Sequence, residues 1–255
     1  MIYREKKIYS GNMLEVEIYP ITLQERKQNR RKKKKQSLAK QKNLNDKNAK
    51  KHLIRLINTN FTDKDLSVTL SYKKECLPGT KEEAKKDVDN FIRKLRRYIK
   101  KQQLEELKYI AVIEFKEPTK TQKAVRMHHH LVINGVIDRD TVEKMWNKGR
   151  CNADRLKADE FGYEGLARYI TKDPKGQKRW AQSKNLKQPK VSVNDYKYSN
   201  RKVIEISRSQ GEKKYFENLY KGYIYRDLKV NCNDITGELY IYIKMQDYLG
   251  GKNET

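Results

Sequence analysis

The sequence has little of what marks a secreted or membrane-bound protein. Its three cysteines, Cys76, Cys151 and Cys232, are odd in number and lack the spacing of metal ligands or of a disulfide framework. No apolar run approaches the roughly 20 residues that a membrane-spanning helix needs, and residues 1–7 lack the apolar core of a signal peptide. These absences predict free thiols, a cytoplasmic location and no membrane partner.

The chain also lacks a phosphate-binding loop, an internal repeat and any linker rich in glycine or proline. No Gly-x-x-x-x-Gly-Lys-Ser/Thr segment occurs, which excludes a nucleotide-driven motor of the P-loop type. Hydrophobic residues make up only 36% of the 255 residues, and the mean hydropathy is -1.04. A chain of this length and composition predicts one good core with solvated extensions.

Positive charge dominates what is present. Lysine and arginine number 59 against 33 acidic residues, which gives a formal net charge of +26. Such an excess destabilises a compact protein by self-repulsion unless a polyanion neutralises it. The composition therefore favours a nucleic acid as the partner.

The charge is densest in a basic arm near the N-terminus. Residues 26–51 contain a single acidic residue, Asp46. We predict that this arm contacts DNA phosphates, although a disordered tail or a localisation-like signal has the same composition. The residues predicted to bind DNA here are Arg30, Arg31, Lys32, Lys33, Lys34 and Lys35.

The middle of the chain alternates between strand and helix patterns. Runs rich in β-branched and aromatic residues predict strands at 67–72, 108–115, 126–134 and 150–156. Helical spacing of apolar residues, with capping boxes that begin at Thr80 and Asp140, predicts helices at 80–103, 140–146 and 162–172. This order predicts an α+β fold in which helices cover one face of an antiparallel sheet. Further strands are predicted within residues 1–25 and at 202–206 and 239–243.

Three of the four histidines lie together, at His128, His129 and His130. Side chains alternate between the two faces of a strand, so His128 and His130 share one face and His129 lies on the other. Glu114 ends the preceding strand, and an antiparallel hairpin would bring it opposite the histidines, with Glu117 as the fallback ligand. Two imidazoles and a carboxylate suit Mg²⁺ or Mn²⁺, although such a histidine pair is more often simply hydrogen-bonded.

The helix predicted at 162–172 carries a tyrosine and a lysine at helical spacing. Tyr169 and Lys172 are three residues apart and therefore neighbours on one face. An ammonium nearby favours the phenolate form of a tyrosine and can also bind phosphate. The alternative is structural, because Leu166, Tyr169 and Ile170 could form the apolar stripe that docks the helix on the sheet.

In their order along the chain, these segments resemble the motifs of the HUH endonucleases. Residues 67–72 resemble the first motif, His128-His129-His130 the metal motif, and Tyr169-Ile170-Thr171-Lys172 the nucleophile motif. The resemblance covers roughly residues 51–189, including the segments 58–62 and 179–186, and favours the single-tyrosine rolling-circle replication initiators of small plasmids or filamentous-type phages. One departure is visible, since the centre of the metal motif is normally a bulky hydrophobe and here is His129.

The resemblance implies a ferredoxin/RRM-like catalytic core with a basic N-terminal arm and a β-rich C-terminal extension. The corresponding domains are 1–60, 61–206 and 207–255. It implies nicking and rejoining of single-stranded DNA through a 5′-phosphotyrosine on Tyr169, with Lys172 placing the phosphate and a metal held by Glu114, His128 and His130. Arg179 and Lys184 would bind DNA. The implied partners are a replication origin, a host helicase and a DNA polymerase.

Two alternatives remain open from the residues alone. The same chemistry occurs in relaxases and single-strand transposases of the superfamily. A non-catalytic module could also bind single-stranded nucleic acid on a sheet with basic arms, with the histidines playing no chemical part.

Overall fold

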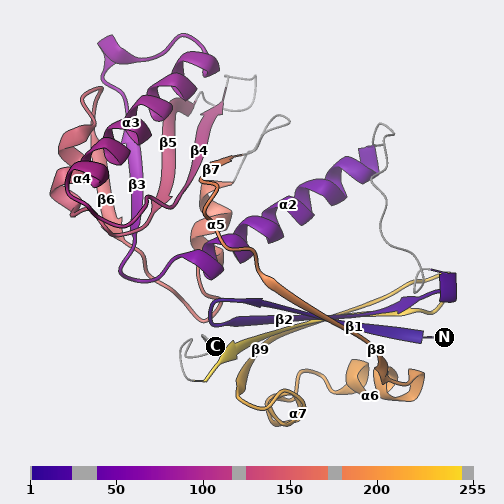
Figure 1. Ribbon diagram of the computed structural model, residues 1–255. Helices are drawn as coiled ribbons and strands as arrows, with labels where there is room; N and C mark the ends of the chain where they lie inside the picture. Colours follow the sequence, from indigo (N-terminus) through magenta and orange to yellow (C-terminus); the bar gives the residue numbers. More distant parts are fainter. Residues whose placement is uncertain (1, 25–38, 117–124, 172–179, 249–255) are drawn as a thin grey trace. The chain divides into compact units, whose positions relative to one another are not determined.

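The computed structural model describes residues 2–24, 39–116, 125–171 and 180–248. The chain forms two compact units (Figure 1), here called the terminal unit and the central unit. The terminal unit comprises Met1–Thr59, Asp159–Gly162 and Gln188–Thr255, and the central unit comprises Asn60–Ala158 and Tyr163–Lys187. This division differs from the three consecutive domains expected from the sequence, because both ends of the chain contribute strands to one sheet.

The central unit contains an antiparallel sheet with strand order β6-β3-β5-β4-β7 in its described residues. The strands are β3 (Leu66–Ser71), β4 (Tyr109–Lys116), β5 (Val125–Ile133), β6 (Cys151–Arg155) and β7 (Ala181–Gln182). The helices are α3 (Lys81–Lys101), α4 (Arg139–Met145) and α5 (Glu164–Ile170), and a 3-10 turn η1 spans Lys74–Cys76. The predicted α+β fold and the order β-α-β-β-α-β-α are confirmed over β3 to α5.

Helices α3 and α4 pack on one face of this sheet (Figure 1). Helix α3 begins where the capping box predicted it, because the Thr80 hydroxyl accepts a hydrogen bond from the Glu83 N–H. Phe91 and Leu95 from α3 are buried with Leu131 from β5. Helix α4 is also confirmed, but its cap is Asp138 rather than the predicted Asp140. The other face of the sheet remains for the side chains of opposite parity.

The terminal unit contains a second antiparallel sheet, with order β8-β1-β2-β10-β9 in its described residues. The strands are β1 (Ile2–Ser10), β2 (Met13–Ile21), β8 (Lys190–Tyr198), β9 (Tyr223–Cys232) and β10 (Leu239–Asp247). The helices are α2 (Ala39–Asn60), α6 (Asn200–Arg208) and α7 (Lys213–Leu219). The strands expected near the N-terminus and at 239–243 are confirmed, and β8 adds an outer strand beside β1.

The strand predicted at 202–206 is wrong, since these residues lie in helix α6. Ser199 caps this helix by accepting a hydrogen bond from the Lys202 N–H. Val203 and Ile206 are spaced for one helical face, and both are fully buried in the core of the terminal unit. A run of β-branched residues suggested a strand, but the capping serine and the burial of one helical face decided the structure.

An ion-pair cluster connects α2 to β2 within the terminal unit. Arg55 donates to Glu15 at 2.6 Å and to Glu17 at 3.0 Å, and Lys6 donates to Glu17 at 3.0 Å. Burial alone would raise the pKa of the Glu17 carboxyl, but the hydrogen bond from Lys6 and the charge of Arg55 outweigh it and lower the pKa below 4.5. Glu17 therefore remains ionised in the folded protein at a pH where the unfolded chain has begun to take up a proton.

This depressed pKa gives a pH-dependent contribution to stability. We expect wild-type protein to exceed the Glu17→Gln variant in free energy of unfolding, fully so above pH 4.5, the usual value of the carboxyl. The difference should shrink as the pH falls towards the lowered pKa of the folded state, because the folded protein then loses the ion pairs. Urea denaturation over a pH series measures it, and a difference that does not change with pH would contradict the assignment.

None of the helices within the described ranges is long and apolar enough to cross a bilayer.

Candidate active site

Strands β4 and β5 bring one carboxylate and two imidazoles to the same face of the central sheet. In their antiparallel register Glu114 lies opposite His128, and Val112 lies opposite His130. Because parity is conserved along each strand, the side chains of Glu114, His128 and His130 point to the same side. This face is opposite to the one that α3 and α4 cover, since Leu131 belongs to the core beneath those helices.

The three side chains converge closely enough to bind one ion. Glu114 Oε2 lies 3.1 Å from His128 Nε2 and 3.1 Å from His130 Nε2. The potential ligand atoms of the three residues all lie within 4.8 Å of one another. The His130 side chain is 5% exposed and that of His128 is 22% exposed, so one edge of the cluster is open to solvent. We call Glu114, His128 and His130 the triad.

Neighbouring groups orient both imidazoles. His128 Nδ1 lies 2.8 Å from the Arg126 carbonyl oxygen, which can only accept, so Nδ1 carries the proton and the Nε2 lone pair faces Glu114. His130 Nδ1 lies 3.4 Å from the Thr69 hydroxyl on β3. Burial and the neighbouring His128 lower the pKa of His130, against the opposing effect of Glu114. A neutral imidazole is the form that binds a metal.

His129 occupies the opposite face and takes no part in the triad. It is fully buried and packs edge-on against Tyr72 and Trp146, and its Nε2 lies 2.7 Å from the Tyr72 hydroxyl. Burial, with the two flanking histidines, lowers the pKa of His129 to about 3 and keeps it neutral. His129 therefore fills the core position where the resembling motif has a bulky hydrophobe.

Tyr169 lies against the triad and is exposed to solvent. Its ring centroid is 5.2 Å from that of His130, with an interplanar angle of 71°, and the residue is 58% exposed. Helix α5 docks instead through Tyr163, Ala167 and Ile170, which are buried and share one helical face. The alternative in which Tyr169 belongs to the docking stripe is thus wrong, and its phenol is accessible to a substrate.

Several residues singled out from the sequence lie outside the described ranges. They are Arg30, Arg31, Lys32, Lys33, Lys34, Lys35, Glu117, Lys172 and Arg179. Lys184 is described and exposed, but it lines a pocket at the other end of β4 rather than the triad. Sequence reasoning missed the hydrogen bonds of Thr69 and Tyr72 to the histidines. No local pattern announces them, because each partner lies on another strand or its continuation.

The donor set fits a divalent cation. Two neutral nitrogens and one carboxylate oxygen are ligands that several divalent metals accept, and three protein ligands leave positions for water or phosphate oxygen. The group is open on the side where Tyr169 lies. The arrangement can therefore hold an ion and an exposed phenol next to the same bound group.

Residues 65–174 match a family model described as a replication-associated protein of the ORF2 type. The match connects this segment with replication-associated proteins. It begins just before β3 and ends beyond α5, so it includes the triad and Tyr169 and lies largely within the central unit. No curated protein and no solved structure matches the chain.

Proposed function

We propose that this protein is an HUH-type endonuclease that nicks and rejoins single-stranded DNA at a replication origin, with Tyr169 as the nucleophile. The observation that carries the proposal is the contact between the exposed Tyr169 ring and His130 of the triad. The match of the same segment to replication-associated proteins supports a role in the initiation of replication.

The reaction exchanges one phosphodiester for another. The Tyr169 hydroxyl oxygen bonds to the phosphorus, the bond from phosphorus to the 3′ oxygen breaks, and the phenolic proton is made up on the departing 3′ oxygen. The products are a free 3′-OH and a 5′-phosphotyrosine. The bond energy is kept in the linkage, so a 3′-OH can reverse the attack and rejoin the strand without a nucleotide cofactor.

The chain's own groups divide the remaining work. Glu114, His128 and His130 would hold a divalent cation, Mg²⁺ or Mn²⁺, which supplies charge stabilisation to a non-bridging phosphate oxygen when bound. The Arg126 carbonyl and the Thr69 hydroxyl keep the imidazoles turned towards that ion. The short helix α5, anchored by its buried face, holds the phenol beside them. Lys172 would place the phosphate.

The proposed setting follows from the chemistry. The substrate is unpaired DNA, so a host helicase or supercoiling must open the duplex and a host polymerase must extend the released 3′-OH. The compartment is the cytoplasm. The residues of the basic arm, with Arg179 and Lys184, would hold the DNA electrostatically. A relaxase or a single-strand transposase would use the same site for a different strand exchange.

The proposal is tested by trapping the covalent product. The full chain is incubated with a pool of single-stranded oligonucleotides that have a randomised central segment, in the presence of Mn²⁺. We expect a protein–DNA adduct that survives denaturing electrophoresis and does not form with EDTA. Binding of the pool without any adduct, under either condition, would support the non-catalytic binding module instead.

A further inference from the structure

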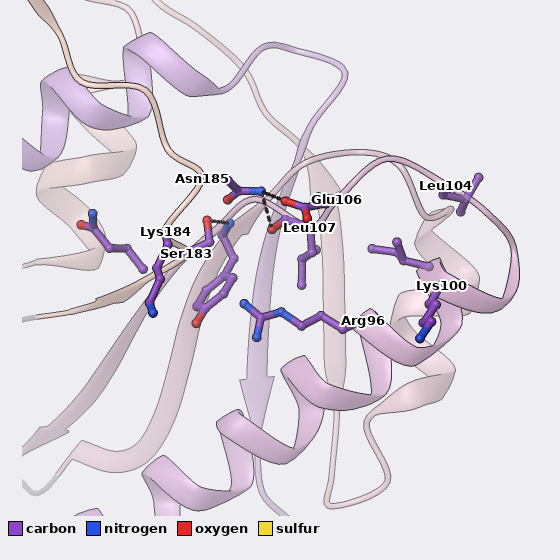
Figure 2. A pocket seen from close by; sticks show the side chains of 11 residues that line it. Arg96, Lys100, Leu104, Glu106, Leu107, Ser183, Lys184 and Asn185 are labelled. Atoms are coloured by element: carbon purple, nitrogen blue, oxygen red, sulfur yellow. Dashed lines mark hydrogen bonds between the residues drawn. The ribbon is translucent and has the colours of Figure 1, made fainter.

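A second polar pocket lies in the central unit, at the opposite end of β4 from Glu114. It has a volume of about 790 Å³ and lies between α3, the start of β4 and the segment that continues β7 (Figure 2). This volume is within the range of ligand-binding clefts, about 300 to 1,000 Å³. Its lining residues are Arg96, Ile99, Lys100, Leu104, Glu106, Leu107, Tyr109, Gln182, Ser183, Lys184 and Asn185.

The charges of this pocket suit a phosphate. Figure 2 shows Arg96 and Lys100 projecting from α3 and Lys184 from the segment after β7. The three cations face a single carboxylate, Glu106, and that carboxylate already accepts a hydrogen bond from the Asn185 amide at 3.1 Å. Arg96, Lys100 and Lys184 are exposed and therefore accessible to a ligand. Arginine and lysine side chains make most phosphate contacts in nucleic-acid complexes.

The pocket also offers a planar surface for a base. The Arg96 guanidinium lies over the Tyr109 ring, 5.6 Å from its centroid. A guanidinium held on an aromatic ring in this way is oriented, and its other face can stack on an unpaired base. Combined cationic and planar side chains are the usual equipment of sites for single-stranded nucleic acid.

Backbone hydrogen bonds make the pocket rigid before any ligand binds. The Tyr109 N–H donates to the Ser183 hydroxyl at 3.1 Å, and the Ser183 N–H donates to the Tyr109 carbonyl at 3.0 Å. Asn185 Nδ2 donates to the Leu107 carbonyl at 3.4 Å. The chain after β7 is thus tied to β4, and little ordering is left for a ligand to impose.

We propose that this pocket binds one nucleotide of the single-stranded DNA substrate, with its phosphate between Arg96, Lys100 and Lys184 and its base stacked on the Arg96 guanidinium. This proposal rests on the proposed function only for the identity of the substrate. Tyr109 and Glu114 are five residues apart on one strand, about 17 Å. The bound nucleotide therefore belongs to the DNA that flanks the cleaved phosphate, and the pocket sets which strand segment reaches Tyr169.

The test measures DNA binding without cleavage. Fluorescence anisotropy follows a labelled single-stranded oligonucleotide binding to full-length Tyr169→Phe protein in EDTA, over a range of salt concentrations. Adding Arg96→Gln and Lys100→Gln should weaken binding about tenfold and make the slope of log K against log salt less steep by about 1.4, because two phosphates are no longer neutralised. Because no adduct is needed, this result does not depend on the nicking chemistry.

Arg93→Gln with Arg97→Gln is the matched control. These arginines are exposed on the same helix with the same four-residue spacing, and they do not line the pocket. The control should change the affinity by less than about twofold. Equal losses in the two double variants would show a general electrostatic field and overturn the proposal, as would no loss in either. Displacement of the oligonucleotide by free deoxynucleoside monophosphates at matched concentration would identify a site for free nucleotides and also overturn it.

Discussion

Replacing Tyr169 with phenylalanine is expected to abolish the covalent protein–DNA product while leaving DNA affinity within about twofold. The substitution removes the one oxygen that can bond to phosphorus and keeps the ring that lies beside His130. Loss of a covalent nucleophile removes the intermediate itself, whereas loss of an electrostatic group only slows its formation. Adduct formation is followed by denaturing electrophoresis, and affinity by anisotropy.

Two other tyrosines serve as controls for this prediction. Tyr163 lies on the same segment but is buried, and burial together with Asp63 and Asp65 raises its pKa to about 12, which makes it a poor nucleophile. Tyr196 is 80% exposed on β8. Tyr163→Phe and Tyr196→Phe should both retain adduct formation. Trypsin separates residues 158–168 from 169–172, so mass spectrometry of the adduct distinguishes Tyr163 from Tyr169. Nucleotides on any other peptide would contradict the assignment.

The second large effect is expected from the triad. His130→Ala, His128→Ala and Glu114→Gln should each lower the rate of adduct formation by at least about 10²-fold. Each change removes a ligand from a group of atoms that lie within 4.8 Å of one another. The same variants should weaken Mn²⁺ binding, measured by electron paramagnetic resonance without DNA. This second readout separates loss of the ion from loss of the substrate.

His129→Leu is the control for the triad. It places a bulky hydrophobe in the buried position and removes the partner of the Tyr72 hydroxyl. We expect a lower free energy of unfolding, by about 1 to 3 kcal/mol, with Mn²⁺ affinity and the adduct rate within a few-fold of wild type. If His129→Leu lost the ion as completely as His130→Ala, in a protein that remains folded, the assignment of two imidazoles rather than three would be wrong.

Much of the candidate site was predictable because it depends on local rules. Side chains alternate along any strand, so the separation of His128 and His130 from His129 required no coordinates. The strand ending at Glu114 and the hairpin after it placed the carboxylate opposite the histidines. In the same way, the capping threonine and the helical spacing of apolar residues predicted α3 almost to its ends.

Other features depend on contacts that no local pattern encodes. The exposure of Tyr169 was open in the sequence, because Leu166, Tyr169 and Ile170 have the spacing of a buried stripe. The structure turns the helix so that Tyr163, Ala167 and Ile170 are buried instead. The helix at 200–208 was missed for a related reason, since burial of Val203 and Ile206 outweighed a local preference for strand.

The sequence by itself determined the charge of this protein, its strand and helix periods and which histidines share a face, because these follow from composition and from the geometry of a few neighbouring residues. Only the tertiary structure decided that strands from the two ends of the chain complete one sheet, that His129 pairs with Tyr72, and that α3, β4 and the segment after β7 enclose a cationic pocket. These features join residues far apart in the chain, and packing of whole elements selects them.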